Sequence, residues 1–513
     1  MQGGFPLVIS KIYSAFCLGI NAHLIEIEVD VANGLPQMIV VGLADTGIKE
    51  ARERVRSAIK NSGYRFPGEK ITINLAPADI KKEGTAFDLA IAVGLLAASG
   101  VIQEEGLEDY LFLGELALDG SIRPVKGTAV VSSQFKDSKK IITPTLNAKE
   151  ACLEKSARIY PATNLREVVE FLNGETKLNP MISSVDAEAL SSPFSFGVDF
   201  SEVKGQPIAK RAVEIAVAGG HNLIFIGPPG SGKTMIARRV PTILPPLEYD
   251  EALEITKIYS VAGLTDGSSL IKERPFRAPH HSVSLVGLAG GGSWPGPGEI
   301  SLAHQGVLFL DELPEFRRDA LESLRGPLEE GEITISRAKM RVAFPAKMLL
   351  LAAMNPCPCG FLSDQKKSCR CSLSQIQKYQ SKISGPILDR IDLHVEVASL
   401  SINTLTNDEP CESSAKIRER ILICRDKQRR RYAGFNFSLN SQMKPRDFRN
   451  FVQLSADGKK LLEMALKELR LSARAYFKIL KISRTIADLA GSKNVEDIHL
   501  AEAIQYRSLD RQW

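Results

Sequence analysis

Residues 227–234 of this chain read Gly227-Pro228-Pro229-Gly230-Ser231-Gly232-Lys233-Thr234, and this stretch decides the fold. Its glycines allow backbone torsions that a Cβ would forbid, so the amides can turn inward around an anion. Lys233 then supplies a positive charge to the β- and γ-phosphates of a nucleotide, and the Thr234 hydroxyl coordinates Mg²⁺. An apolar run at 222–227 precedes the loop and a helical pattern at 235–240 follows it, as a phosphate-binding loop requires. The sequence therefore predicts an α/β domain that binds ATP or GTP.

Two later apolar runs end in polar residues suited to nucleotide hydrolysis. Residues 306–310 lead into Asp311 and Glu312, and residues 348–354 lead into Asn355. Because open α/β sheets bind ligands at the carboxyl ends of their strands, we expect these side chains near the phosphates. Asp311 would complete the Mg²⁺ shell, Glu312 would polarise the attacking water, and Asn355 would sense the γ-phosphate or orient that water. An acidic helix cap after a strand is the structural alternative for Asp311 and Glu312.

The order of these features, followed by two arginines, resembles that of the AAA+ ATPases, and specifically their magnesium-chelatase-like branch. The segment Ile387-Leu-Asp-Arg390-Ile-Asp392 matches the one that carries the arginine finger of that branch. The resemblance implies that Arg390 enters a neighbour's site in a ring, usually a hexamer. A local ion pair of Arg390 with Asp389 or Asp392 is the alternative.

Two further matches to AAA+ proteins concern the nucleotide. Arg474, in Ser472-Ala-Arg474, matches the sensor-two arginine of the family, although Arg484 competes for that role. Val203-Lys-Gly-Gln206 resembles the segment that borders the adenine pocket, and the guanine-reading motif Asn-Lys-x-Asp does not occur in the chain. ATP is therefore the expected nucleotide, with Mg²⁺ as its cofactor.

Four of the eight cysteines are closely spaced, and Cys357, Cys359, Cys369 and Cys371 form the pattern Cys-x-Cys-x9-Cys-x-Cys. In a cytosolic ATPase, paired thiols are more consistent with a metal site than with disulfides. Four thiolates suit a closed tetrahedral zinc site that would pin the polar loop between the two pairs. The position just after Asn355 indicates a structural and not a catalytic metal. Reduced free thiols in a flexible insertion are the alternative.

Residues 1–170 show the patterns of a separate α/β domain. Strand patterns occur at 22–31, 71–75 and 110–118, and helical patterns at 46–62 and 87–98. The segments at 82–88 and 114–124 resemble the proteolytic fold of Lon protease, which is shared with ribosomal protein S5 domain 2-like modules. The nucleophilic serine of the protease falls near Ala86 and its catalytic lysine near Ala129, so the Ser-Lys nucleophile of the protease is absent. A dyad of Ser121 and Lys126, unrelated to that of the protease, is the alternative.

The predicted architecture is α/β, with three domains and one linker. Residues 1–170 form the Lon-like, S5 domain 2-like module, 171–200 a linker, 201–400 the AAA+ P-loop ATPase core with the four-cysteine insertion at 357–371, and 401–513 a C-terminal helical lid. A length of 513 residues with 44% hydrophobic content suffices for more than one core. The chain has no apolar stretch long enough to span a bilayer and no basic segment before its first apolar residues, so we expect a cytoplasmic protein.

A basic hairpin is the best candidate for contact with DNA. Residues 331–336 and 340–344 alternate as the strands of a β-hairpin, and Arg337, Lys339 and Arg341 make its tip basic. In related hexameric helicases such a hairpin points into the central pore, so the resemblance implies phosphate contacts there. The net charge of +5 gives no separate indication of a nucleic-acid partner.

Three other features have open interpretations. The glycine-rich segment 284–298, which carries Trp294, resembles the helix-two insert of the same group but suits an ordinary surface loop equally well. The basic segment 416–431 suits either contact with a phosphate backbone or a solvated helix face. Adjacent His280 and His281 would point to opposite faces of a strand, so we expect them to position a loop and not to bind a metal.

Over nearly its whole length the chain is similar to the ComM/YifB family of magnesium-chelatase-like ATPases. The match rests on the Lon-like module, residues 227–234, the Cys-x-Cys pairs, Phe276-Arg-Ala-Pro-His-His281 and Ser483-Arg-Thr-Ile-Ala-Asp-Leu-Ala490. The resemblance implies a hexameric DNA helicase that promotes branch migration while imported single-stranded DNA is integrated during natural transformation. The alternative is a chelatase motor subunit that uses ATP to insert Mg²⁺ into a porphyrin. An ATP-dependent protease is opposed by Ala86 and Ala129.

Overall fold

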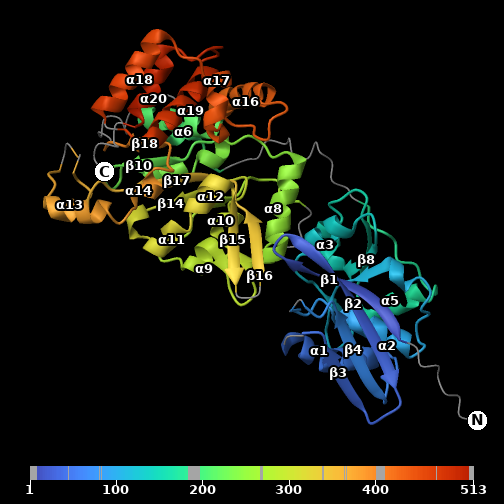
Figure 1. Ribbon diagram of the computed structural model, residues 1–513. Helices are drawn as coiled ribbons and strands as arrows, with labels where there is room; N and C mark the ends of the chain where they lie inside the picture. The colour runs from blue at the N-terminus through green and yellow to red at the C-terminus, as the bar shows by residue number, and fades with distance from the viewer. Residues whose placement is uncertain are drawn as a thin grey trace, which may run out of the picture.

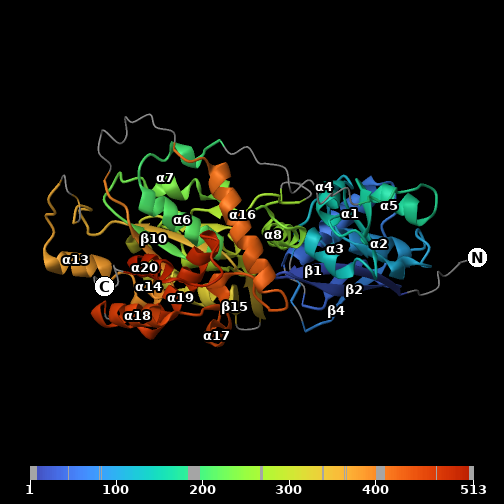
Figure 2. The ribbon, with the colours of Figure 1, turned by 90° about the horizontal axis from the view of Figure 1, so that it is seen from above.

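The computed structural model describes residues 9–43, 46–79, 81–82, 84–182, 197–265, 270–337, 340–362, 364, 367–399, 411–469 and 471–507. The chain is a mixed α/β protein. Figure 1 shows an N-terminal part, in blue and cyan, beside a larger part that runs from green to red, with α8 at their junction. Figure 2 shows the same arrangement from above. Within the described residues, none of the helices has both the length and the apolar character needed to cross a membrane.

The first sheet of the N-terminal part has the strand order β1-β2-β4-β3. Strand β2 is antiparallel to β1 and β4, and β3 is parallel to β4. The strands predicted at 22–31 and 71–75 are confirmed as β2 and β4, in which buried side chains alternate with more exposed ones. The strands span Ser10–Leu18 (β1), Asn21–Ala32 (β2), Gln37–Val41 (β3) and Lys70–Ala76 (β4).

Both predicted helices of the N-terminal part are confirmed, as α1 (Thr46–Asn61) and α2 (Asp88–Ala98). Helix α2 packs against α1 and against strands β1 and β2. Its side chains from Leu89 to Ala97 are all buried, which explains why the sequence of this helix has no polar face.

A second sheet, with the order β5-β8-β9, is parallel throughout. The prediction of one continuous strand at 110–118 is wrong, because β5 ends at Phe112 and β6 has only two residues. The amide of Gly114 leaves the strand direction and donates to the carbonyl of Ala86 at 3.1 Å. The elements span Tyr110–Phe112 (β5), Glu115–Leu116 (β6), Ile122–Arg123 (β7), Thr128–Phe135 (α3), Lys140–Pro144 (β8), Thr145–Ala151 (α4), Arg158–Ala162 (β9) and Leu165–Leu172 (α5).

A five-stranded parallel sheet forms the centre of the larger part, with the order β11-β14-β17-β10-β18. Strands β10, β14 and β17 are buried along their whole length, as their uninterrupted apolar runs predict. The strands predicted at 222–227, 306–310 and 348–354 are therefore confirmed. The strands span Leu223–Ile226 (β10), Phe276–Arg277 (β11), Val307–Leu310 (β14), Leu349–Met354 (β17) and Leu393–Glu396 (β18).

Helices surround this sheet, and two insertions extend from it. The predicted basic hairpin is confirmed as the antiparallel pair β15 (Glu332–Arg337) and β16 (Met340–Pro345). The glycine-rich segment contains the short strands β12 (Gly290–Gly291) and β13 (Gly296–Pro297). The helices span Pro207–Gly219 (α6), Lys233–Ala237 (α7), Tyr249–Ala262 (α8), Leu285–Ala289 (α9), Glu299–Leu302 (α10), Arg318–Glu322 (α11), Arg325–Glu330 (α12), Leu373–Gln380 (α13) and Gly385–Leu388 (α14).

The described residues after 411 are mainly helical. Ile479, Ile482 and Ile486 of α19 are buried in the same hydrophobic core as α6 and strand β10. This shared core fixes the C-terminal helices to one side of the parallel sheet, as Figure 1 shows. The helices span Ser414–Arg431 (α16), Phe448–Phe451 (α17), Ala456–Glu468 (α18), Ala473–Leu489 (α19) and Asp497–Gln505 (α20).

Helix α8 joins the two parts of the molecule through a polar contact. The amide of Gly127, just before α3, donates to the carbonyl of Ser260 at 3.1 Å. The buried carboxylate of Glu150 on α4 accepts hydrogen bonds from the hydroxyls of Ser260 and Thr265 at 3.4 and 2.5 Å. The amide of Ala129 also faces the Ser260 hydroxyl at 3.4 Å, so the position that resembles the Lon lysine is covered by α8.

A second contact links the N-terminal part to the two insertions. The ring centres of Phe16 on β1 and Trp294 lie 5.9 Å apart, so the glycine-rich segment packs against the N-terminal part. A Cβ on Gly19, in the turn between β1 and β2, would overlap Val342 of β16. Of the predicted linker, residues 183–196 lie outside the described residues, and the amide of Met181 donates to the carbonyl of Ile159 in β9.

Candidate functional site

The phosphate-binding loop lies between β10 and α7. Gly230 and Gly232 have φ angles of +76° and +94°, which favour glycine over any residue with a side chain. A Cβ on Gly227 would overlap the carbonyl oxygen of Val397, which follows β18. Helix α7 begins at Lys233, two residues earlier than predicted, so its first turn includes the end of the motif. The loop therefore has the strand, the turn and the helix start that phosphate binding requires.

Lys233 lies at the centre of this loop and is only 8% exposed. Its ammonium donates to the carbonyls of Gly227 and Pro228 at 2.7 and 2.9 Å, and to Asn355 Oδ1 at 3.3 Å. Burial lowers the pKa of Lys233 to about 8, although Asp311 and Glu312 act in the opposite direction. Negatively charged phosphates would stabilise this buried cation, so the residues present fit a nucleotide.

Two further observations support the fit to a nucleotide with Mg²⁺. The hydroxyl of Thr234 donates to Asp311 Oδ2 at 2.6 Å, which brings two hard oxygen ligands together. The Ser231 hydroxyl is buried and has no hydrogen-bond partner among the described residues. Thr234 and Asp311 could thus hold Mg²⁺, whose chemistry is to neutralise phosphate charge.

Glu312 extends from the end of β14 and is in contact with a histidine. Its backbone has φ of +54°, an unusual value for a residue with a side chain, and its amide donates to Asp311 Oδ1 at 3.0 Å. His281 Nδ1 lies 3.4 Å from Glu312 Oε2. The expectation that His280 and His281 point apart is wrong, because they follow β11 in a loop and their rings lie 4.0 Å apart. Sequence spacing gave no signal for this contact.

Gln206, the last residue of the segment expected near adenine, is in contact with the phosphate-binding loop. Its side-chain amide donates to the carbonyls of Ser231 and Ala398 at 3.2 and 2.7 Å. Its backbone is left-handed, with φ of +55°, at the N-terminus of α6. Gln206 therefore connects the residues before α6 with the phosphate-binding loop and with the end of β18.

Arg390 makes its contacts away from Lys233. Its guanidinium lies 2.6 Å from Glu329 Oε1 on α12 and donates to the carbonyls of Arg325 and Pro386 at 3.1 and 2.7 Å. The alternative pairing with Asp389 or Asp392 is wrong, since those carboxylates face Arg474 and Lys478 at 3.5 and 3.1 Å.

The two sensor-two candidates have different surroundings. Arg474 is 61% exposed, and its contact with Asp389 places it beside the segment of Arg390. Arg484 is buried, pairs with Asp488 at 2.9 Å and donates to the carbonyls of Ser492 and Lys493. Arg484 therefore has a structural role, and Arg474 is the candidate that a phosphate can reach.

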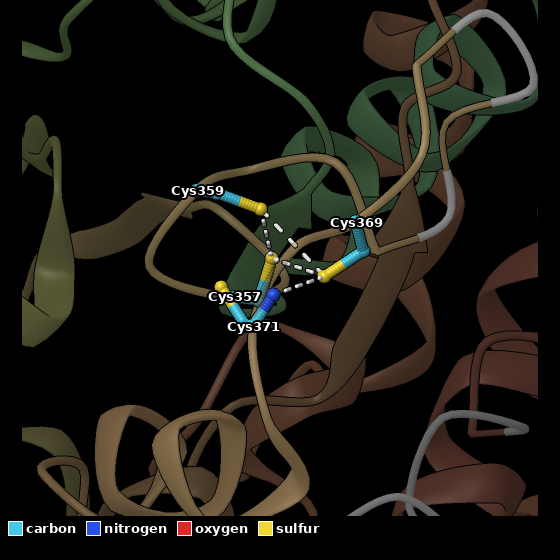
Figure 3. Close-up of side chains that lie close together, drawn as sticks. All are labelled: Cys357, Cys359, Cys369 and Cys371. Atoms are coloured by element: carbon cyan, nitrogen blue, oxygen red, sulfur yellow. Dashed lines mark hydrogen bonds between the residues drawn. The ribbon is translucent and has the colours of Figure 1, made fainter.

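The four clustered cysteines come together beside the phosphate-binding loop. Figure 3 shows the sulfur atoms of Cys357, Cys359 and Cys369 grouped together, with the sulfur of Cys371 beside them. The Sγ atoms of Cys357, Cys359 and Cys369 are 3.4 to 3.7 Å apart, and all four ligand atoms lie within 4.8 Å of one another. A tetrahedral zinc ion with Zn–S bonds of about 2.3 Å needs sulfur separations of about 3.8 Å, so the cluster fits zinc.

The two thiols of the first Cys-x-Cys pair have opposite pKa shifts. Backbone amides of Arg370 and Phe361 lower the pKa of Cys359 to about 6, whereas burial raises the pKa of Cys357 to about 12. A bound cation would favour the thiolate of both.

The basic hairpin presents the exposed side chains of Arg337 and Arg341, and Lys339 lies outside the described residues. The basic helix α16 behaves differently, because many of its arginines pair with carboxylates of the same chain. These pairs include Arg420 with Glu214, Arg429 with Glu248, Arg430 with Asp426 and Arg431 with Asp488. The pairing favours a structural role for α16.

Three family descriptions match consecutive parts of the chain. They are "Subunit ChlI of Mg-chelatase" over residues 27–147, "Magnesium chelatase, subunit ChlI" over 199–405 and "Magnesium chelatase, subunit ChlI C-terminal" over 411–507. The chain is 46% identical over 503 residues to the "Competence protein ComM" of Haemophilus influenzae, covering 98% of this chain and 97% of that protein. The chain belongs to the ComM/YifB family.

Another member of the ComM/YifB family, the "Uncharacterized protein YifB" of Escherichia coli, is 44% identical over 506 residues, which are 98% of each chain. The "Maternal DNA replication licensing factor mcm6" of Xenopus tropicalis is 23% identical over 335 residues, which are 60% of this chain and 36% of that protein. Membership of this Mg-chelatase-like AAA+ family identifies the chain as an ATPase and implies ATP and Mg²⁺.

Proposed function

We propose that this chain is an ATP-dependent DNA motor that forms a hexameric ring and promotes branch migration during recombination of imported DNA in natural transformation. The observation that carries the proposal is the position of the basic hairpin. Strands β15 and β16 are inserted between β14, which leads to Glu312, and β17, which leads to Asn355. A change at the γ-phosphate can therefore reach the exposed Arg337 and Arg341 through α11 and α12 on one side and through β17 on the other.

Nucleotide hydrolysis is assigned to residues around the phosphate-binding loop. Lys233 binds the β- and γ-phosphates, and Thr234 and Asp311 hold Mg²⁺. Glu312 polarises the attacking water and Asn355 orients it. The contacts of Lys233 with Asn355 and of Thr234 with Asp311 support these roles.

The proposed ring rests on two arginines, and the proposed DNA contact rests on the basic hairpin. Arg390 acts on nucleotide held by a neighbouring subunit, and Arg474 acts as the sensor-two arginine. The contact of Arg474 with Asp389, the residue before Arg390, supports a shared region for the two arginines. Arg337, Lys339 and Arg341 contact DNA phosphates without reading sequence. The relatives named as a competence protein and a DNA replication licensing factor support a role with DNA.

The remaining assignments concern organisation. The four-cysteine cluster holds a structural zinc ion, which the sulfur separations support. Residues 1–170 form a Lon-like module without proteolytic activity, 171–200 the linker, 201–400 the ATPase core and 401–513 a helical lid. We expect the protein to act in the cytoplasm.

Branch migration of a synthetic Holliday junction tests the proposal. The double variant Arg337→Ala/Arg341→Ala should migrate the junction more slowly than wild type and show a smaller ratio of ATPase rates with and without DNA. Its DNA affinity should depend less on salt, with the logarithmic slope reduced by roughly 0.7 to 0.9 per lost phosphate contact. The control Arg446→Ala/Lys460→Ala removes the same charge from side chains that are 76% and 75% exposed. Unimpaired migration by the hairpin variant would place the DNA contact elsewhere.

The family descriptions favour one second candidate, a chelatase motor subunit that uses ATP to insert Mg²⁺ into a porphyrin. It would share the nucleotide site but has no need for DNA. ATP hydrolysis that DNA leaves unchanged, together with metal insertion into a porphyrin by a reconstituted system, would favour this candidate.

A further inference from the structure

The four-cysteine cluster lies against the nucleotide site on two sides. Cys357 is the second residue after Asn355, whose side chain accepts from Lys233 at 3.3 Å. Gly360, which follows Cys359, packs directly on Pro229 of the phosphate-binding loop. A Cβ on Gly360 would overlap Cδ of Pro229 and lie 2.8 Å from its Cγ. Asn355 and Gly360, which lie on either side of Cys357 and Cys359 in the sequence, are thus fixed relative to the phosphate-binding loop.

The second cysteine pair, Cys369 and Cys371, is connected through helix α13 to the residue next to Asn355. Helix α13 begins with Leu373, two residues after Cys371, and Ser372 caps it by accepting from the amide of Gln375. Gln380 donates to the carbonyl of Pro356 at 3.3 Å. The two ends of the segment 356–380 are therefore in contact, and the four cysteines lie between these ends in the sequence.

The described residues of the loop between the cysteine pairs make local contacts, such as the amide of Lys367 donating to Asp364 Oδ1 at 3.3 Å. Residues 363, 365 and 366 lie outside the described part of the chain, and the described Lys367 and Ser368 are exposed. A metal ion that joins both Cys-x-Cys pairs would close the segment with bonds much stronger than the single hydrogen bonds at its ends.

We propose that the four-cysteine cluster is a metal-dependent positioning site for the nucleotide. Zinc bound to Cys357, Cys359, Cys369 and Cys371 raises the affinity for ATP, because it holds Gly360 against Pro229 and Asn355 against Lys233. The inference rests on the proposed zinc site and adds a consequence that a merely stabilising zinc ion would not have. Since binding free energies are reciprocal, ATP must also tighten zinc binding by the same factor.

The test uses the full-length protein, with zinc measured by elemental analysis and ATP affinity by calorimetry. Removal of zinc with a chelator should weaken ATP binding by a factor in the range of roughly 5 to 150, and added Zn²⁺ should restore it. Gly360→Ala should retain about one zinc ion per chain and still lose ATP affinity at least fivefold, because the Cβ separates the cluster from Pro229.

Gly434→Ala is the matched control. Gly434 has φ of +89°, close to the +84° of Gly360, but a Cβ there meets no atom within 4 Å. Gly434→Ala should therefore bind ATP as wild type does, and equal losses in the two variants would overturn the inference. Zinc removal and Gly360→Ala that both leave ATP affinity unchanged would overturn it as well, while the zinc site itself would stand. Wild-type protein that lacks zinc would overturn the site and the inference together, without bearing on hydrolysis or DNA. If zinc removal unfolds the chain, Gly360→Ala decides alone.

Discussion

At the scale of single residues, the nucleotide site depends on a few polar groups held in unusual surroundings. The ammonium of Lys233 is buried, and its described partners are uncharged carbonyl and amide oxygens. Glu312 has a left-handed backbone at the end of a buried strand. Each of these features costs free energy in the folded chain, as expected where a protein keeps groups ready for a ligand.

We expect Lys233→Ala and Glu312→Gln to separate ATP binding from hydrolysis. Loss of the Lys233 charge removes a charge-assisted hydrogen bond of about 1.5–3 kcal/mol, so the Kd for ATP should rise roughly 10- to 150-fold. Glu312→Gln keeps the shape of the side chain but removes the base, so kcat should fall about 10²- to 10⁴-fold with ATP binding intact. Calorimetry and steady-state ATPase rates measure the two effects, and normal turnover by Glu312→Gln would remove that residue from the mechanism.

His281 is expected to position Glu312. Because His281 Nδ1 lies 3.4 Å from Glu312 Oε2, His281→Ala should leave the carboxylate free to rotate. We expect kcat to fall by about tenfold, the value of one hydrogen bond to a charged group, with the KM for ATP little changed. His281→Asn, which retains a hydrogen-bonding side chain, should recover part of the rate.

His280→Ala is the neighbouring control, since His280 Nδ1 contacts the Ser282 hydroxyl at 2.8 Å instead of Glu312. Its effect on kcat should be smaller than that of His281→Ala. Equal effects of the two substitutions would argue against a specific contact between His281 and Glu312.

At the scale of elements, a buried ionic cluster joins α19 to the start of β18. Lys478 on α19 lies 3.1 Å from Asp392 Oδ1 and donates to the carbonyl of Ile391 at 2.9 Å. His221, after α6, lies 3.7 Å from Asp392 Oδ2. Burial acts to raise the pKa of Asp392, but Lys478 and His221 outweigh it and hold that pKa below its usual range. The charge pair therefore fixes the C-terminal helices to the parallel sheet.

We expect Asp392→Asn to destabilise this junction by about 3–5 kcal/mol, because it leaves the Lys478 ammonium buried without its counter-charge. Urea unfolding measures the change. In the wild type the carboxylate contributes stability above its unfolded pKa of about 3.9, and that stability is lost as the pH falls through its lower folded pKa. Asp426→Asn, in an exposed pair with Arg430, is the control and should change stability by about 0.5 kcal/mol or less. Equal stability of the two variants would show that Asp392 does not fix α19.

At the scale of the whole molecule, the N-terminal part contacts the ATPase at α8 and at the two insertions. The Glu150 contact reaches Ser260 and Thr265, and the turn at Gly19 reaches Val342 of the basic hairpin. A movement of the hairpin must therefore move or break a contact with the N-terminal part. This arrangement gives the N-terminal part a mechanical connection to the hairpin.

The proposed ring predicts that two inactive variants complement each other. Lys233→Ala loses its own site, and Arg390→Ala loses the arginine given to a neighbour, so each alone should hydrolyse little ATP. In a mixed ring, the Arg390 of a Lys233→Ala subunit can serve the intact site of an Arg390→Ala subunit. For random mixing of equal amounts, about a quarter of the sites should be complete. ATPase rates across mixing ratios measure the effect, and a rate that never exceeds that of the single variants would show that Arg390 does not act between subunits.

The features that could be predicted from the sequence are those that depend on neighbours along the chain. The glycine spacing of residues 227–234 and the apolar runs before Asp311 and Asn355 predicted the loop and its strands, because buried parallel strands have uninterrupted apolar sequences. The alternation at 331–344 predicted the hairpin, because successive side chains of a strand point to opposite faces. The Cys-x-Cys pairs predicted a cluster, because ligands two residues apart bind one ion readily. The identities of Lys233, Thr234, Asp311 and Asn355 as site residues followed from these patterns, and the structure brings the four together.

Contacts between residues that are distant along the chain could not be predicted and were found in the folded structure. The break in the strand at Gly114 arises from a hydrogen bond to Ala86, and the contact between His281 and Glu312 joins two loops that follow different strands. The pairing of Arg390 with Glu329 and the packing of Gly360 on Pro229 also join segments far apart in the chain. Such contacts depend on the strand order within the parallel sheet and on the shapes of side chains that become neighbours in the fold. Neither of these can be recognised in a short stretch of sequence. For this reason the sequence predicted which residues are the candidates to bind phosphate, whereas the contacts that hold these residues in place became visible only in the packing of the folded chain.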